Sequence, residues 1–230
     1  MKKRYIAINI LFFIAIMTAD SIFAATDAIA AKAAASLCFT AECVFNVIIC
    51  ARKKAKMRFS VIMLAGITAA CAADIALYYD LITGMALFGI GHILYFISYC
   101  VCERLSLRDF IPGAISSAGL FVVIFTAPIL DFGEGAFMTV AVCAYAVIIS
   151  VMVGKALSDV IRRKSRLNIV IAVGSGMFWI SDFALMFSIF AGIKFAGLIC
   201  LFTYYPAQFV LSLSPLIFAH NREKALSENA

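Results

Sequence analysis

The chain is divided into eight long apolar segments by short breaks of charged residues, glycine or proline. The apolar segments cover residues 5–25, 28–50, 59–79, 83–102, 110–130, 135–154, 167–190 and 195–218. Each is close to the roughly 20 residues that a helix needs to cross a bilayer. The pattern predicts an all-α fold, a polytopic membrane helix bundle of eight transmembrane helices. We expect a single integral membrane domain over residues 1–230, with a short polar cytoplasmic tail at 219–230.

The composition supports this interpretation and excludes a soluble globular protein. Hydrophobic residues make up 65% of the chain and charged residues 14%, whereas soluble domains carry roughly 25% charged residues. The eight cysteines lie in or beside apolar segments and form no Cys-x-x-Cys pair, so we interpret them as small packing residues. The two histidines, His92 and His220, are too few for a three-histidine zinc site, and no metal is expected.

Basic residues predict the topology. With the N-terminus in the cytoplasm, 17 of the 19 lysines and arginines fall on the inner side, as positively charged inner loops require. Lys32 and Lys194 are the two exceptions. We therefore expect both termini in the cytoplasm and the chain in a cell or inner membrane. The net charge of +6 then reflects topology, and no nucleic-acid partner is expected. An alternative is that residues 2–28 form a signal peptide, which would leave seven helices.

Two aspartates lie inside apolar segments in matching phrases. Asp74 lies in Ala-Asp-Ile-Ala-Leu (73–77) and Asp182 in Ser-Asp-Phe-Ala-Leu (181–185). An ionised carboxylate in hydrocarbon costs several kcal/mol, so such residues usually face a wet or paired interior. The pair predicts a two-carboxylate site inside the bundle. The structural alternative is that both carboxylates only tie helices together through hydrogen bonds.

Other polar residues of the spans share the depth of these aspartates, between the midplane and the outer surface. Among them are Lys32, His92, Tyr95, Tyr204, Tyr205 and Gln208. A shared layer predicts one polar cavity, which these side chains would line or orient. Asp20 lies in the same layer, although a position at the membrane interface would also explain it. Glu42 lies at a different depth and has no assigned role.

The chain also carries a pattern that occurs twice. Residues 59–102 contain Asp-x-Ala-Leu, a short outer turn, and then His92 and Tyr95. Residues 167–218 contain Asp-x-Ala-Leu, a short outer turn, and then Tyr204, Tyr205 and Gln208. The recurrence indicates two parallel four-helix repeats, as in several membrane folds.

An ordered set of short motifs resembles a known family. The set comprises Ala73-Asp74, Gly89-Ile-Gly-His92-Ile-Leu-Tyr95, Tyr145 with Met152, Gly176-Met-Phe-Trp-Ile-Ser181-Asp182, and Tyr204-Tyr205-Pro-Ala-Gln208. Together they resemble the YhhN-like family of multi-spanning membrane proteins, whose characterised members are lysoplasmalogenases. The resemblance covers residues 28–212. The chain departs from the family pattern at Ala73, where the family prefers glycine, and at Ala33, where it prefers proline.

The resemblance implies hydrolysis of the vinyl-ether bond of lysoplasmalogens, which gives a fatty aldehyde and a glycerophospho-base. A vinyl ether is hydrolysed by protonation of its β-carbon and attack of water on the resulting cation. This requires one protonated carboxyl group and one carboxylate, as in glycosidases, and Asp74 and Asp182 would supply them. Lys32 would meet the phosphate of the lysophospholipid substrate; from its position alone it could also pair with an aspartate or extend its side chain to the membrane interface. No cofactor is implied, and the partners would be this substrate and membrane lipids.

Two other classes of protein fit the same residues. A small transporter or proton-coupled carrier would also use intramembrane carboxylates within parallel repeats. Such a carrier needs access to its site from both sides, whereas the polar layer of this chain is one-sided. A non-catalytic membrane partner would use the carboxylates as structural hydrogen-bonding groups and should tolerate Asp→Asn at either site.

Overall fold

A computed structural model of the protein describes residues 3–53, 55, 57–133 and 135–228. The described residues form helices and short connections and contain no strand. The α-helices are α1 (Lys3–Thr26), α2 (Ile29–Arg52), α3 (Met57–Tyr79), α4 (Leu81–Cys102), α5 (Phe110–Thr126), α6 (Ala136–Arg162), α7 (Arg166–Phe190), α8 (Lys194–Ser212) and α9 (Ser214–Glu228), with a 3₁₀ turn, Leu107–Asp109, before α5. Eight stretches of this described chain are long and apolar enough to cross a membrane, and the last combines α8 with most of α9.

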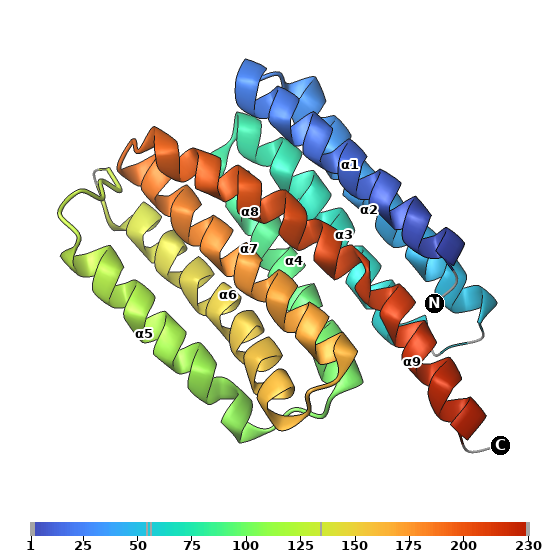
Figure 1. The fold of residues 1–230 in the computed structure, drawn as a ribbon. Helices are drawn as coiled ribbons and strands as arrows, with labels where there is room; N and C mark the ends of the chain where they lie inside the picture. Colours follow the sequence, from blue (N-terminus) through green and yellow to red (C-terminus); the bar gives the residue numbers. More distant parts are fainter. Residues whose placement is uncertain (1–2, 54, 56, 134, 229–230) are drawn as a thin grey trace.

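Six helices form a closed ring around the centre of the bundle. Each helix contacts the next in the order α2, α3, α4, α6, α7 and α8, and α8 in turn contacts α2. Helix α1 lies outside this ring against α2 and α8, and α5 lies outside it against α6. The beginning of α1 and the end of α9 lie at the same end of the bundle, as an even number of spans requires (Figure 1). We call the opposite end the far end.

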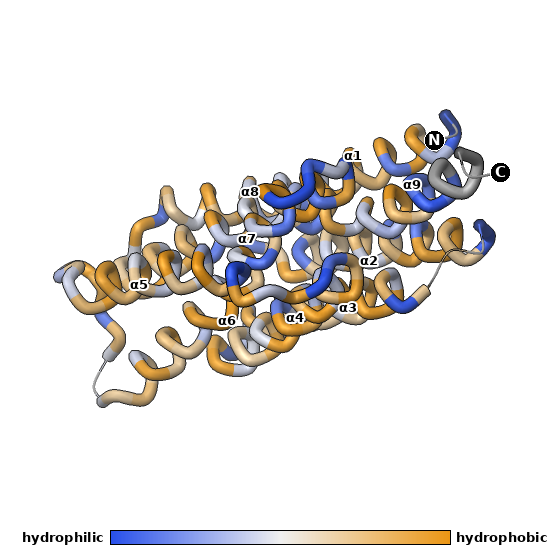
Figure 2. Tube along the Cα trace, turned by 90° about the horizontal axis from the view of Figure 1, so that it is seen from below, coloured by the Kyte–Doolittle hydropathy of each residue, from blue (hydrophilic) through white to orange (hydrophobic). Residues whose placement is uncertain are grey.

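Apolar residues cover most of helices α1 to α8, and hydrophilic residues gather at the helix ends and at a few interior points (Figure 2). Large apolar side chains such as Leu11, Ile115 and Val122 are more than half exposed, as expected of surfaces that face lipid. Hydrophilic residues inside the bundle are therefore the exception. They include Asp74, which is 2% exposed, and His92, which is fully buried.

Three helix ends lie more than two residues from the sequence prediction. Helix α5 ends at Thr126 rather than at 130, because Ala127 precedes Pro128 and such residues favour extended backbone. Helix α6 continues to Arg162 rather than ending at 154, and its added turns carry buried charged residues. The last predicted span, 195–218, is interrupted at Leu213, and the expected tail from 219 is helical as far as Glu228.

The pair α5–α6 is held at close range by two glycines, and this gives a first prediction. A Cβ atom on Gly154 would lie 2.4 Å from the backbone nitrogen of Gly113. Gly154→Ala must therefore push the helices apart, and we expect it to lower the free energy of unfolding by about 1–3 kcal/mol. Gly176→Ala is the matched control, because its Cβ would meet nothing within 4 Å. Thermal unfolding in detergent measures both, and equal melting temperatures would contradict the prediction.

Candidate functional site

Asp74 lies near the far end of α3 and is held by three side chains. Its Oδ1 atom is 2.7 Å from the ammonium nitrogen of Lys32 on α2. Its Oδ2 atom accepts hydrogen bonds from the Ser36 hydroxyl at 2.5 Å and from the Tyr205 hydroxyl, on α8, at 2.8 Å. Lys32 is 7% exposed and Ser36 and Tyr205 are fully buried. The lysine therefore balances the charge of this carboxylate inside the bundle.

Asp182, on α7, is held differently. Its Oδ2 atom accepts a short hydrogen bond from the Tyr145 hydroxyl of α6 and lies 3.2 Å from Nε2 of His92 on α4. Nε2 of His92 is also 2.8 Å from the Tyr145 hydroxyl, so the three groups form a triangle. No described lysine or arginine forms an ion pair with Asp182. Its Oδ1 atom receives no hydrogen bond from the described residues, so it is free for another partner.

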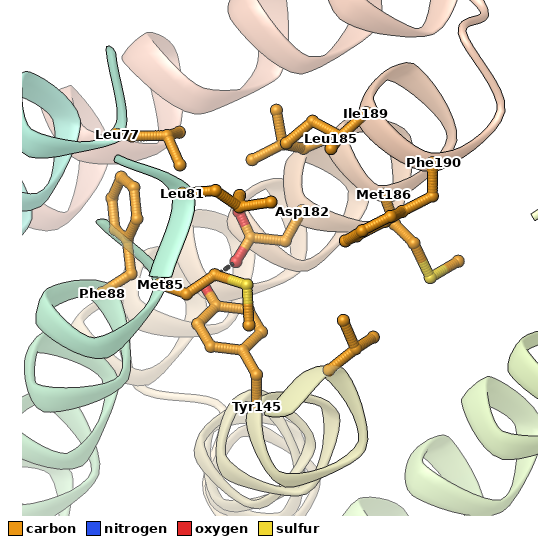
Figure 3. A pocket seen from close by; sticks show the side chains of 11 residues that line it. Leu77, Leu81, Met85, Phe88, Tyr145, Asp182, Leu185, Met186, Ile189 and Phe190 are labelled. Carbon is orange, nitrogen blue, oxygen red and sulfur yellow. Dashed lines mark hydrogen bonds between the residues drawn. The ribbon is translucent and has the colours of Figure 1, made fainter. Parts of the chain in front are cut away.

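Both carboxylates border one cavity of about 380 Å³ near the far end. Its lining also includes Lys32, Tyr204 and Lys194, the first residue of α8. Asp182 borders a second pocket as well, and that pocket is otherwise almost entirely apolar (Figure 3). Its wall comes from α3, α4, α6 and α7, and its lining side chains are Leu77, Leu81, Met85, Phe88, Val142, Tyr145, Asp182, Leu185, Met186, Ile189 and Phe190. Asp182 therefore lies where the cavity that holds Lys32, Asp74 and Lys194 meets an almost entirely apolar pocket.

The remaining predicted residues lie around or below these two clusters. Tyr204 lines the cavity with its ring, and its hydroxyl reaches the carbonyl oxygen of Ala70 at 3.4 Å. Tyr95 donates a hydrogen bond of 2.9 Å to the side-chain oxygen of Gln208. Both residues are fully buried and neither lines the cavity. The structure therefore brings Lys32, Asp74, Tyr204 and Asp182 to one cavity and leaves Tyr95 and Gln208 as a bridge between α4 and α8.

The two clusters follow the same plan. Each aspartate is bound by the second helix of its own half, through Ser36 on α2 or Tyr145 on α6, and by the fourth helix of the other half, through Tyr205 on α8 or His92 on α4. Tyr95 follows His92 by three residues, and Gln208 follows Tyr205 by three residues. Tyr95 and Gln208 form a hydrogen bond with each other. Exchange of partners between halves is what two parallel repeats related by an axis through the ring would produce.

Two residues of these clusters were missed by the site prediction. Ser36 follows Lys32 by four residues and therefore lies on the same face of α2, which is the signal that could have identified it. Tyr145 occurs within the motifs that resemble the family, but nothing in the apolar run around it indicates a contact with Asp182.

The described residues contain no group of three or more histidine, cysteine or acidic side chains that could hold a metal ion. The arrangement can hold one proton-donating and one proton-accepting carboxyl group next to a lysine. The Nδ1 atom of His92 is buried without a hydrogen-bond partner in the described chain. The Asp182 triangle can therefore rearrange its protons without breaking a further protein contact.

Comparison with known proteins gives one match. The model of the YhhN family matches residues 27–215, which include both aspartate clusters and all the helices of the ring. Neither the curated proteins nor the solved structures give a match. Because the family model covers more than half of the chain, the chain belongs to the YhhN family.

Proposed function

We propose that the protein is an intramembrane hydrolase that cleaves the vinyl-ether bond of lysoplasmalogens, releasing a fatty aldehyde and a glycerophospho-base. The position of Asp182, where the apolar pocket meets the cavity that holds Lys32 and Asp74, carries this proposal. The apolar pocket has a volume of about 50 Å³, enough for the first carbons of a hydrocarbon chain next to Asp182 (Figure 3). A lysophospholipid with these carbons in the apolar pocket and its head group in the cavity that holds Lys32 and Asp74 would place the bond between them beside Asp182. Membership of the YhhN family is consistent with such an activity.

The surroundings of the two carboxyl groups favour different roles. Asp74 is paired with Lys32 at 2.7 Å, so it is suited to remain ionised, to accept a proton from water and to stabilise a nearby cation. Asp182 lacks a lysine or arginine partner among the described residues and borders the apolar pocket, where a neutral carboxylic acid costs less than a carboxylate. We therefore assign the proton donor to Asp182 and the base to Asp74.

These roles give a balanced reaction. Asp182 transfers its proton to the vinyl carbon that is not bonded to oxygen, and the positive charge spreads over the other carbon and the ether oxygen. Water adds to that carbon while Asp74 takes the released proton. The hemiacetal hydroxyl then loses its proton as the bond between its carbon and the glycerol oxygen breaks, and the glycerol oxygen gains a proton in exchange, which gives the aldehyde and the free hydroxyl group. The proton that Asp74 took from water passes to Asp182, so the enzyme is unchanged.

Lysines at the cavity would contact the substrate phosphate. Lys32 lies beside Asp74 within the cavity, and Lys194 is exposed at the beginning of α8 and lines the same cavity. Both were expected on the outer side from the topology. A phosphate between them would receive two point charges, and its position would hold the ether bond at the depth of Asp182.

Aldehyde release by the purified protein tests the proposal. We expect the protein in mixed micelles to release aldehyde from a 1-alkenyl lysophospholipid and none from a 1-acyl lysophospholipid of equal chain length and head group. The acyl lipid is the matched control, since it differs only at the bond to be cleaved. A folded protein that releases no aldehyde would contradict the proposal. Uptake assays in vesicles would then test the alternative of a carrier that uses the same carboxylates.

A further inference from the structure

Asp20 of α1 is a buried carboxyl group that the proposed reaction does not use. It is fully buried, and neither of its oxygens has a hydrogen-bond partner in the described chain. The sequence alone allowed a position at the membrane interface, and the structure instead turns this residue toward the interior. An ionised carboxylate without a partner would cost several kcal/mol at such a place. Asp20 is therefore suited to carry a proton.

The pairing of α1 with α2 defines the level of Asp20. The side chains of Asn9 and Asn46 exchange hydrogen bonds of 2.9 and 3.2 Å, which fixes the register of these two antiparallel helices. Asp20 lies eleven residues beyond Asn9, and Ala35 lies eleven residues before Asn46. Eleven residues are about three helical turns, so Asp20 lies on the side of α1 that faces α2, and Ala35 lies on the side of α2 that faces α1. Asp20 is thus level with Ser36, which donates to Asp74.

Contacts of Lys32 give the same placement independently. The Lys32 ammonium lies 4.9 Å from the centre of the Phe23 ring. Phe23 follows Asp20 by three residues, so both side chains lie on the same face of α1. Phe23 lines the cavity, whereas Asp20 does not, so Asp20 lies on the Lys32-facing side of α1 but outside the cavity lining.

We propose that Asp20 is a third acidic group of the site and that Asp20 and Asp74 share one proton beside the single ammonium group of Lys32. This inference rests on the proposed function and adds a positioning residue to it. Neither Asp20 oxygen hydrogen-bonds to Asp74 in the described chain, so a water molecule between them would relay the proton. The O–H bond of Asp20 breaks, the water takes that proton and gives one of its own to Asp74, and the negative charge passes to Asp20 without change in total charge. Two carboxyl groups beside one cation favour such sharing, because both cannot ionise at equal cost.

The shared proton would serve the return step of the reaction. After water has added to the substrate, Asp74 holds the proton taken from water and Asp182 has lost its own. If Asp20 can also hold a proton, one proton remains on Asp20 or Asp74 while the other returns to Asp182. Asparagine at position 20 cannot hold a proton in this way, whereas glutamate can.

Infrared spectroscopy tests the proton sharing without reference to activity. The difference between wild type and Asp20→Asn should show one lost carboxylic-acid C=O band at neutral pH, and Asp74→Asn should shift that same band. Glu42 is the matched control, because it is also fully buried with both oxygens unpartnered in the described chain. It lies six residues past Ser36, about 9 Å further along α2. The band lost in Glu42→Gln should not move in Asp74→Asn. Absence of an acid band from Asp20, or a band unaffected by Asp74→Asn, would overturn the proposal.

Kinetics test its consequence. We expect Asp20→Asn to lower kcat, by less than the roughly 100-fold of a direct proton donor, and to leave KM unchanged. Asp20→Glu should restore most of kcat, and Glu42→Gln should retain it. Full kcat in Asp20→Asn, or an equal loss in Glu42→Gln, would overturn the role in the reaction. Coupled infrared bands in a protein without hydrolase activity would instead contradict the proposed function and uphold the shared proton.

Discussion

Replacing Asp182 with asparagine should lower aldehyde release from a lysoplasmalogen by at least about 100-fold, because asparagine cannot deliver a proton. The substitution preserves size and shape. An asparagine oxygen can still accept the hydrogen bond that the Tyr145 hydroxyl gives to Asp182, and its amide can still face Nε2 of His92. The contacts of α7 with α4 and α6 should therefore persist, so the loss should appear in kcat with little change in the melting temperature. Initial rates of aldehyde formation by purified protein measure the effect.

Asp131→Asn is the matched control for this experiment. Asp131 is exposed in the connection between α5 and α6, and its carboxylate accepts the backbone N–H of Gly133. The same chemical change there should leave the rate unaltered. If Asp182→Asn kept more than half of the wild-type rate, Asp182 would not be the proton donor. The structural alternative, in which the carboxylate only ties helices together, would then be correct for this residue.

The sequence predicted the parts of the fold that depend on local composition. A run of about 20 apolar residues has few stable alternatives to a spanning helix in a bilayer, and the eight expected spans correspond to the eight observed stretches. The same logic marked Asp74 and Asp182, because an ionisable residue in such a run is costly wherever it lies. The family was also predicted correctly, since the ordered motifs fall within the matched residues 27–215.

The partners of the aspartates could not be predicted in this way. Asp74 and Asp182 were expected to lie in one two-carboxylate site; both border the same cavity, and each is held by its own cluster of side chains. Which side chain meets which aspartate depends on helix rotation and on the crossing of the two halves, and neither leaves a trace in local hydropathy. For Lys32 the sequence left open a position at the interface, a pairing with an aspartate and a contact with a phosphate, and the structure pairs it with Asp74.

The partners of the buried Lys155 could not be predicted from the sequence either. It was interpreted as one of the basic residues that mark the inner side, but its side chain is fully buried. Its ammonium nitrogen lies 2.6 Å from Asp159 and 3.1 Å from Asp109, and Arg162 bridges the same two carboxylates at 2.5 and 3.1 Å. The Ser158 hydroxyl donates to Asp109 at 2.6 Å. Two cations and two anions thus join the beginning of α5 to the last turns of α6, which explains why α6 extends beyond its predicted end.

We expect Lys155→Met to be the most destabilising of the substitutions considered, by about 3–5 kcal/mol, because it leaves a buried carboxylate without its cation. Methionine fits the volume of the lysine stem, so the loss should come from charge and not from a cavity. The double variant Lys155→Met/Asp159→Leu should recover much of the stability, since Arg162 and Asp109 then remain as a balanced pair. Reversible unfolding from mixed micelles by increasing the denaturing detergent measures all three proteins.

Lys53→Met is the control that separates the effect of losing a buried ion pair from the effect of losing an exposed one. Lys53 lies 2.6 Å from Glu223, as close as Lys155 lies to Asp159, but the side chain of Glu223 is 59% exposed. Water and salt screen that pair, and its loss should cost no more than about 1 kcal/mol. Equal effects of Lys53→Met and Lys155→Met would show that the buried cluster does not hold α5 and α6 together. A double variant less stable than Lys155→Met alone would show that Asp159 contributes through contacts other than its charge.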